Sequence, residues 1–298
     1  MSKGSCLQII TALSLSLLGP ISAWADRFEF VSDRSLSSID ENFGGFSGLE
    51  LSQDGSSLIA ISDRGFVMQA SIERDGDHIS QIKISKIAPV LQINGNPVTP
   101  ANFDAEGLAT AADGTSYISF EGFHRVRQYP DILGPAQNLP AHSDFASQQT
   151  NSSLEVLAID AQNRLYTAPE RSGKLERPFP LWRFEDGAWQ RFGTIPRLGE
   201  YLLVGADIGP DGKFYLLERG FRGITFSARI RRFSIGARGL IAGETLLVTD
   251  YGTHDNLEGL SIWQDSAGAI RATMISDDNF RFFQTTELVE YVLKSDAP

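Results

Sequence analysis

The sequence predicts an all-β protein, specifically a β-propeller built from four-stranded blades. Three observations support this prediction: one segment pattern occurs five times, each copy has the form of two strands joined by a turn, and further strand-like segments lie between the copies. Corresponding positions of successive copies are 49–59 residues apart, a spacing typical of propeller blades. A content of 42% hydrophobic and 21% charged residues is that of a folded globular chain and excludes extended disorder.

The N-terminal segment has the pattern of a secretory signal. Lys3 precedes a mostly apolar run over residues 6–18, and Ala23-Trp24-Ala25 places small residues at the two positions that signal peptidase recognises. The run is too short to span a bilayer comfortably, and no later stretch is long enough. We therefore expect residues 1–25 to be a signal peptide, and residues 26–298 to form one propeller domain that is periplasmic or secreted.

Each of the five copies predicts a short strand, a turn rich in Asp, Gly or Asn, and a second strand. In chain order, the copies are FSGLELSQDGSSLIAISDRG from Phe46, AEGLATAADGTSYISFEG from Ala105, LEVLAIDAQNRLYTAPER from Leu154, LVGADIGPDGKFYLLERG from Leu203 and LEGLSIWQDSAGAIRATMISDDN from Leu257. Two such strands make the inner half of a blade, and the intervening segments are expected to supply the outer half.

The outer strands follow from the segments between the copies. They are predicted at Phe66–Ile72 with Ile79–Ile84, Arg125–Tyr129, Leu181–Phe184 with Trp189–Phe192, and Arg229–Phe233 with Leu246–Thr249. After the fifth copy only Glu287–Leu293 remains, so the last blade lacks a strand, which Arg27–Val31 can supply to close the ring. Five blades are visible, and segments 86–103 or 131–153 could form a sixth.

Acidic residues recur at two positions of the repeat that should meet on one face of the propeller. The first position, at the start of the innermost strand, holds Ser47, Glu106, Glu155, Val204 and Glu258. The second position, at the end of the next strand, holds Asp63-Arg64, Glu121, Glu170-Arg171, Glu218-Arg219 and Asp277-Asp278. Asp104, Asn151 and Asn256 lie just upstream and can add oxygen ligands or hydrogen bonds. We expect these residues to surround the mouth of the central channel, with Val204 interrupting the acidic ring.

Charge and residue content limit what this mouth can do. Acidic residues outnumber basic ones 37 to 26, which disfavours binding to a nucleic acid backbone. One cysteine and four histidines leave no thiolate or histidine cluster for zinc, so a bound metal should be a hard cation with oxygen ligands. Crowded carboxylates repel, and arginine pairing, a cation such as Ca²⁺, or retained protons could offset that repulsion. Alternatively, the acids accept backbone hydrogen bonds and lock adjacent blades together.

Several motifs, taken in order, resemble those of the bacterial phytase-like family, whose label is "esterase-like activity of phytase". They are GGFSGLELSQDG with ISDRG, DAEGLA with SFEG, NSSLEVLAIDAQNRL with APER, LERGF, and DNLEGLSIW with ISDDNF and QTTELVEY, within residues 43–293. The resemblance implies an exported β-propeller that hydrolyses phosphate or other esters. The positions that match are Ser47, Asp63, Glu106, Glu121, Glu155, Glu170, Glu218, Glu258, Asp277 and Asp278.

A looser resemblance is to propeller lactonases, in which a Glu at the start of an inner strand holds a divalent cation in the channel. Glu106 in AEGLA and Glu258 in LEGLS are similarly positioned. Ser47 is not expected to act as a nucleophile, because Leu49 stands where G-x-S-x-G requires its last glycine.

Two functional hypotheses follow. The first is a hydrolase that uses Ca²⁺ or another hard divalent cation and acts on a small anionic or ester substrate. Its catalytic residues would be Glu106, Glu155 and Glu258, its metal ligands would come from these and Asp63, Asp277 and Asp278, and its substrate-binding arginines would be Arg64, Arg171 and Arg219. The second is a non-catalytic exported propeller that binds a small ligand or a protein; a metal-dependent lactonase is a further alternative.

Overall fold

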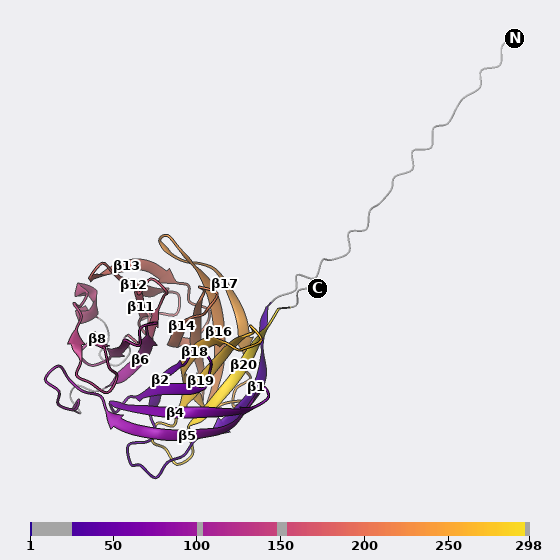
Figure 1. Cartoon of the computed structure of the whole chain (residues 1–298). Coiled ribbons are helices and arrows are strands. Elements are labelled where there is room, and N and C mark those ends of the chain that lie inside the picture. Colours follow the sequence, from indigo (N-terminus) through magenta and orange to yellow (C-terminus); the bar gives the residue numbers. More distant parts are fainter. Residues whose placement is uncertain (2–25, 100–103, 148–153, 296–298) are drawn as a thin grey trace.

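Five four-stranded antiparallel sheets are arranged around a central axis in the computed structural model (Figure 1), which describes residues 1, 26–99, 104–147 and 154–295. The predicted all-β propeller is therefore confirmed, and the number of blades is five. The predicted signal peptide lies almost entirely outside the described residues. Among the described residues, no helix has the length and apolar character needed to cross a membrane.

The blades, numbered along the chain, each begin at the central axis and end at the periphery. Blade 1 contains β2 (Phe46–Leu51), β3 (Ser57–Ser62), β4 (Phe66–Asp75) and β5 (His78–Pro89). Blade 2 contains β6 (Ala105–Thr110), β7 (Ser116–Phe120), β8 (Arg125–Tyr129) and β9 (Gln137–Asn138), followed by the short 3₁₀ helix η1 (Ser143–Ser147). Segments 86–103 and 131–153 form no sheet of their own in their described parts, which provide the end of β5 and the two-residue strand β9.

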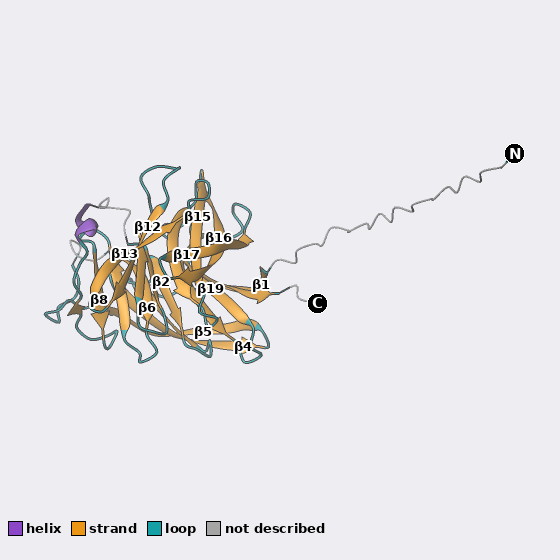
Figure 2. Ribbon diagram, turned by 90° about the horizontal axis from the view of Figure 1, so that it is seen from above, coloured by secondary structure: helices purple, strands orange, loops and turns teal. Residues whose placement is uncertain are grey.

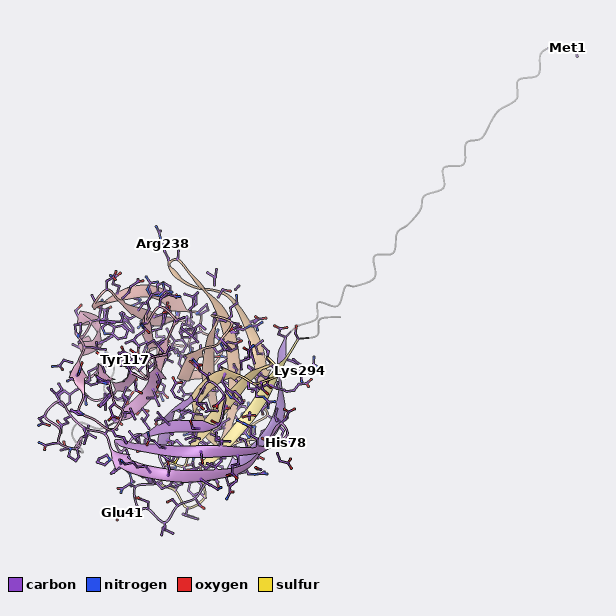
Figure 3. The ribbon with its side chains drawn as sticks, in the orientation of Figure 1. Met1, Glu41, His78, Tyr117, Arg238 and Lys294 are labelled. Atoms are coloured by element: carbon purple, nitrogen blue, oxygen red, sulfur yellow. The ribbon has the colours of Figure 1, made fainter. Side chains whose placement is uncertain are left out.

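The remaining three blades follow the same plan. Blade 3 contains β10 (Val156–Ile159), β11 (Leu165–Ala168), β12 (Phe179–Glu185) and β13 (Ala188–Ile195). Blade 4 contains β14 (Leu202–Ile208), β15 (Phe214–Arg222), β16 (Thr225–Gly236) and β17 (Gly239–Val248). Blade 5 contains β18 (Asn256–Gln264), β19 (Ile270–Asp277), β20 (Glu287–Lys294) and β1 (Arg27–Ser35). Side chains fill the spaces within and between these sheets, and Arg238 lies at the tip of the β16–β17 hairpin (Figure 3).

The five innermost strands pack against one another through glycines of the repeat. A Cβ atom on Gly107 of β6 would lie 2.6 Å from the Cβ of Leu157 in the next blade, and one on Gly259 of β18 would lie 2.9 Å from the Cβ of Leu49. Side chains larger than hydrogen would therefore force adjacent blades apart. The axial cavity lined by these strands has a volume of only about 10 Å³, so the channel is filled with protein atoms at its middle.

A β-bulge occurs in four of the five innermost strands, at the position where the repeat carries its acid. In β18, Leu257 pairs with Ser276 and Gly259 pairs with Ile275, which leaves Glu258 as the extra residue. The same irregularity occurs around Ser47, Glu106 and Val204 of β2, β6 and β14. Because a bulge changes the direction in which a side chain points, these residues are directed at the channel mouth and away from the sheet ladder.

The ring is closed by the N-terminal strand, as predicted. Strand β1 pairs antiparallel with β20, from Arg27 opposite Lys294 to Ser35 opposite Glu287. Figure 1 shows the two strands side by side at the edge of blade 5, and Figure 2 shows β1 at the outer edge of the propeller. Phe28 of β1 is buried among side chains of blades 4 and 5. The first and last strands of the domain thus depend on each other for their pairing.

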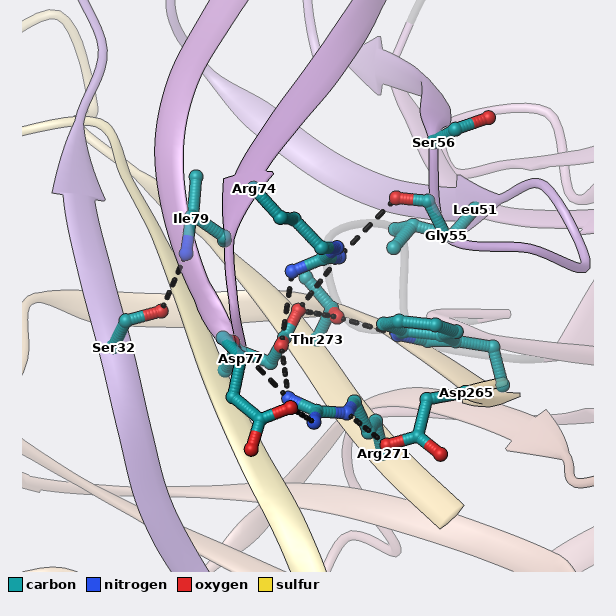
Figure 4. A network of polar contacts seen from close by, with 12 residues as sticks. Ser32, Leu51, Gly55, Ser56, Arg74, Asp77, Ile79, Asp265, Arg271 and Thr273 are labelled. Carbon is teal, nitrogen blue, oxygen red and sulfur yellow. Dashed lines mark hydrogen bonds and ion pairs between the residues drawn. The ribbon is translucent and has the colours of Figure 1, made fainter. Parts of the chain in front are cut away.

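A buried charged network fastens blade 5 to blade 1 (Figure 4). Glu290 of β20 is fully buried and accepts hydrogen bonds from Arg271 (2.9 Å) and Arg74 (3.1 Å). Arg271 also pairs with Asp77 in the β4–β5 turn, at 2.7 Å, and with Asp265 in blade 5, at 2.8 Å. A buried carboxylate with two guanidinium partners is stable only while both remain in place.

We predict that Glu290→Gln lowers the free energy of unfolding by about 3 kcal/mol or more, because it leaves two largely buried arginines without their shared carboxylate. Glu73→Gln is the matched control, since Glu73 pairs with Lys83 at the surface and its loss should cost less than about 1 kcal/mol. Denaturant unfolding of both variants gives the comparison. Equal losses in the two variants would contradict the role assigned to Glu290.

Candidate functional site

Acidic side chains from four blades gather at the channel mouth, on the face where the innermost strands begin. Glu106 and Glu258 project from bulges in β6 and β18, and Glu155 directly precedes β10. Asp63, Glu121 and Glu170 follow the second strands of blades 1, 2 and 3, and Asp277 ends β19. The structure therefore brings the predicted catalytic residues Glu106, Glu155 and Glu258 to one face, together with the predicted ligands Asp63 and Asp277.

The tightest group consists of Asp104, Glu106 and Glu121, whose carboxylate oxygens lie within 4.8 Å of one another. Backbone hydrogen bonds position them: the amide of Asp104 donates to the carbonyl of Asp63 (2.8 Å), and the amide of Glu121 donates to the carbonyl of Asp104 (2.9 Å). Asp104 has a φ of 76°, which is uncommon for a residue other than glycine and aims its side chain from the loop before β6. We call these three residues the acidic triad.

Glu106 of the triad and one oxygen of Asp63 have no side-chain hydrogen bond among the described residues. The side chain of Glu106 accepts no hydrogen bond from the part of the chain that the structure describes, although this residue is buried, with only 8% of its surface exposed. Oδ1 of Asp63 is buried and accepts no hydrogen bond within the described part of the chain. Buried oxygens without donors are costly, and a cation is one group that could satisfy them.

The burial and the crowding of these acids raise their pKa values. Burial, followed by the neighbouring charges of Glu258 and Glu121, holds the pKa of Glu106 well above its usual range. The pKa of Glu155 is raised in the same way, by burial and then by Glu106. Burial and Glu258 raise the pKa of Asp63 to about 6 and that of Asp277 to about 8. The crowded, buried acids of the mouth are therefore harder to ionise than acids in water, and bringing all of them to the charged state would require a compensating positive charge.

Arg219 pairs with the acids of the mouth that belong to blades 3 and 5. It extends from β15 in blade 4, where Val204 takes the position of the acid, and its guanidinium forms an ion pair with Glu258 and donates to Glu170 (2.8 Å). It also donates to Oδ1 of Asn256 (2.9 Å), whose Nδ2 donates to Glu258 (2.9 Å). Blade 4 thus contributes a positive charge to the ring of acids, and this charge is shared by Glu170 of blade 3 and Glu258 of blade 5.

Three other predicted site residues have different partners in the structure. Asp278 accepts hydrogen bonds from the amides of Gly45 and Phe280 and from the hydroxyl of Thr286, so its oxygens hold the surrounding loops in place. Arg64 is exposed and stacks on the ring of Phe280, 3.1 Å from the centroid. Arg171 pairs with Glu170 at 2.9 Å. Of the three arginines predicted to bind substrate, therefore, Arg171 and Arg219 already pair with acids of the mouth.

Two further positions of the repeat, Glu218 and Ser47, make contacts within the protein. Glu218 points into blade 4 and pairs with Arg229 and Arg231, so it is not part of the mouth. Ser47 is buried and hydrogen-bonds to Glu258, which lowers the pKa of that carboxyl against the larger effect of burial. Asn151 lies outside the described residues.

A second pair of carboxylates, the half-buried Glu50 and the buried Asp207, lies at the opposite end of the channel. Glu50 accepts a hydrogen bond from the amide of Thr110 (3.1 Å), and Asp207 accepts one from the amide of Ile262 (2.6 Å). Each bond joins adjacent blades. Glu50 and Asp207 therefore fit the interpretation that carboxylates lock adjacent blades together. The triad differs, because its carboxylates are gathered close to one another.

The comparisons with known proteins concern the whole propeller. Solved structures with similar folds include a PQQ-bound aldose sugar dehydrogenase from Streptomyces coelicolor, with 11% identity over 88% of this chain and 98% of that one and a TM-score of 0.46. Others are a protein of unknown function from Dyadobacter fermentans (12% identity, 91% and 88% covered, TM-score 0.46) and a glucose dehydrogenase (11%, 87% and 99%, TM-score 0.47). Likeness at this level carries no information on ligand or reaction.

No curated protein sequence matches the chain. The family model described as phytase-like, esterase-like activity of phytase, matches residues 41–280, which include every acid of the channel mouth described above. This range covers most of the chain and agrees with the resemblance of the repeat motifs. The protein therefore belongs to the phytase-like family described by its esterase-like activity.

Proposed function

We propose that this protein is an exported hydrolase that cleaves phosphate or other esters at the acidic channel mouth with the help of a divalent cation. The observation that carries the proposal is the acidic triad, in which three carboxylates face one another within 4.8 Å while Arg219 pairs with acids elsewhere on the rim. Membership of the family supports hydrolysis of an ester bond, and the pattern of the first 25 residues supports export.

The triad and Asp63 fit a hard cation. Carboxylate oxygens are the ligands that Ca²⁺ prefers. The buried Oδ1 of Asp63 accepts no hydrogen bond among the described residues, and the backbone carbonyl of Asp63 accepts the amide of Asp104, a member of the triad. Asp104, Glu106 and Glu121 would hold the ion. When bound, such an ion polarises an ester oxygen and makes bound water more acidic.

Other residues of the mouth would bind and orient the reacting groups. Glu155 is half-buried and lies among the acids without belonging to the triad, so it is the group best placed to move a proton between water and the leaving oxygen. Arg219 fixes Glu170 and Glu258 in place from blade 4. The filled channel below them restricts water to the open side.

We predict that Glu106→Gln lowers ester hydrolysis at least about a hundredfold, because it removes a ligand from the triad. The assay uses p-nitrophenyl acetate, p-nitrophenyl phosphate, phytate and simple lactones, with Ca²⁺ or with chelator. Glu50→Gln is the matched control, since it changes a half-buried carboxylate on an innermost strand at the far end of the channel, and it should retain turnover.

The outcomes of this assay separate the alternatives. Turnover that persists in chelator or in Glu106→Gln would reject the cation-dependent mechanism. Turnover of lactones alone would indicate a lactonase. Absence of turnover on every substrate, with Glu258→Gln lowering thermal stability through the loss of its ion pair with Arg219, would favour a non-catalytic binding propeller.

We also predict that the cation-free protein loses stability as the pH rises from about 4 to about 8. The pKa of Asp63 is raised to about 6 and that of Asp277 to about 8, so the folded state holds protons that the unfolded state has released. Melting temperatures measured in chelator should therefore fall by several degrees across this range, and Ca²⁺ should restore them most at the upper end.

The control for this measurement is Asp277→Asn, which removes the group with the pKa of about 8 and should flatten the decline above pH 6. A melting temperature that rises with pH in chelator would contradict the electrostatic account of the mouth. A pH profile unchanged by Ca²⁺ would contradict cation binding there.

A further inference from the structure

A second cavity opens on blade 2, outside the channel mouth. It has a volume of about 500 Å³ and lies between strand β8 and the segment that follows β5. Its walls include Gln92, Ile93, Phe123, Arg125, Arg127 and Tyr129. We call it the blade-2 cavity. Neither the repeat nor the triad requires a hollow at this place, where the outer strand β9 is only two residues long.

We infer that the blade-2 cavity binds the anionic group of a ligand, a phosphate or carboxylate carried on a flat apolar body. Arg125 and Arg127 are two residues apart on β8, so their side chains leave the same face of the strand, about 7 Å apart along it. Two guanidinium groups at this separation match an anion that accepts from both.

The guanidinium of Arg127 is available to such an anion. This side chain is half-buried, yet it has no ion pair and no side-chain hydrogen bond with any described residue, in contrast to Arg171 and Arg219 at the mouth. Partial burial lowers the pKa of Arg127, and the neighbouring Tyr129 offsets part of that effect. A half-buried cation that has no counterion among the described residues gains more from an incoming anion than a cation that is already paired.

Arg125 is held in a defined position beside it. Its Nη1 donates to the carbonyl of Phe123 (2.8 Å), and its guanidinium stacks over the ring of Phe120, 4.2 Å from the centroid. Burial and the charge of Arg127 lower the pKa of Arg125 to about 10. The two like charges therefore oppose each other, and an anion between them would relieve that opposition.

The apolar walls define the rest of the ligand. Ile93 and Phe123 are 48% and 66% exposed at the rim of the cavity, an unusual exposure for large apolar side chains beside two arginines. A flat apolar group could cover both while its anion reaches Arg127. The ligand class is thus an aryl or similar apolar phosphate or carboxylate.

Two residues that line the blade-2 cavity lie close to a member of the acidic triad in the sequence. Phe120 and Phe123, which line it, flank Glu121 in the chain, and Asp104 attracts Arg125. An ester anchored here by its anion would extend toward the triad. The assignment of such an ester as the substrate rests on the hydrolysis proposed above. Binding of the anion in the blade-2 cavity does not depend on that hydrolysis.

Isothermal titration with phenylphosphonate tests binding, because this probe has an aryl group and an anion but no ester bond. The buffer contains chelator, so that the triad has no cation. Wild type should bind saturably, and Arg127→Gln should bind about tenfold or more weakly. Arg127→Lys keeps the positive charge but loses the guanidinium group that can donate two parallel hydrogen bonds, so its affinity for phenylphosphonate should lie between those of wild type and Arg127→Gln. Inorganic phosphate should bind more weakly than phenylphosphonate if the apolar walls contribute.

Arg191→Gln is the matched control, since Arg191 lies on an outer strand of blade 3 and also stacks over an aromatic ring, that of Trp182 at 5.1 Å. It should leave binding unchanged. No saturable binding by the wild type, or equal binding by wild type and Arg127→Gln, would overturn the inference.

Kinetics separate this inference from the proposed hydrolysis. Arg127→Gln should raise KM for 4-acetoxybenzoate, whose carboxylate is separate from its ester bond, while leaving p-nitrophenyl acetate unaffected, because only the former carries an anion. If phenylphosphonate binds and no ester is cleaved, the anion site stands and the hydrolase proposal fails. If esters are cleaved but Arg127→Gln changes neither binding nor KM, the hydrolase proposal stands and the anion site is rejected.

Discussion

Closure of the ring is the constraint on which the other features of this structure depend. Strand β1 completes blade 5 beside β20, and Glu290 connects that blade to Arg74 of blade 1. Only in a closed ring do five innermost strands converge on one axis, and only then do acids more than 150 residues apart in the sequence, such as Glu106 and Glu258, influence each other's pKa. The pairing of the two chain ends therefore assembles the site as well as the fold.

Positive charge is distributed unevenly around the channel mouth, because blade 4 differs from the other blades in the residues that it contributes there. Blade 4 carries Val204 where other blades carry an acid, and Arg219 of the same blade reaches the acids on both sides of it. The acids near Arg219 are thereby paired, and those of blade 2 are not paired by it. A uniform acidic ring would have no preferred position for a cation, whereas here Arg219 pairs with Glu170 and Glu258 and not with the acidic triad, which distinguishes the triad from the rest of the ring.

The sequence was sufficient to predict the blades, the closing strand and the convergence of acids, because strand, turn and strand recur within single copies of the repeat and depend on local chemistry. It was not sufficient to assign individual carboxylates. Asp277 and Asp278 are neighbours, yet one faces the mouth and the other accepts hydrogen bonds from loop amides. That distinction depends on residues from other parts of the chain.

The same limit applies to Asp104 and Arg127. Asp104 lies in an irregular segment, and its role depends on a backbone hydrogen bond to blade 1 that no local pattern encodes. The alternating Arg125 and Arg127 of β8 are visible in the sequence, but the pattern is typical of any exposed outer strand. The glycines of the innermost strands recur in four of the five copies, and their purpose, contact with the next blade, appears only in the assembled ring.

The filled centre of the propeller determines how molecules can enter and leave the site. A hollow axis would connect the two faces, but here apolar side chains and glycine backbones occupy it and leave about 10 Å³. The acidic mouth and the opposite face, which carries Glu50 and Asp207, are consequently not connected along the axis. Whatever is released at the mouth must leave on the same face from which the next molecule arrives, so bound product directly excludes substrate, and its departure limits how fast the mouth can be used again.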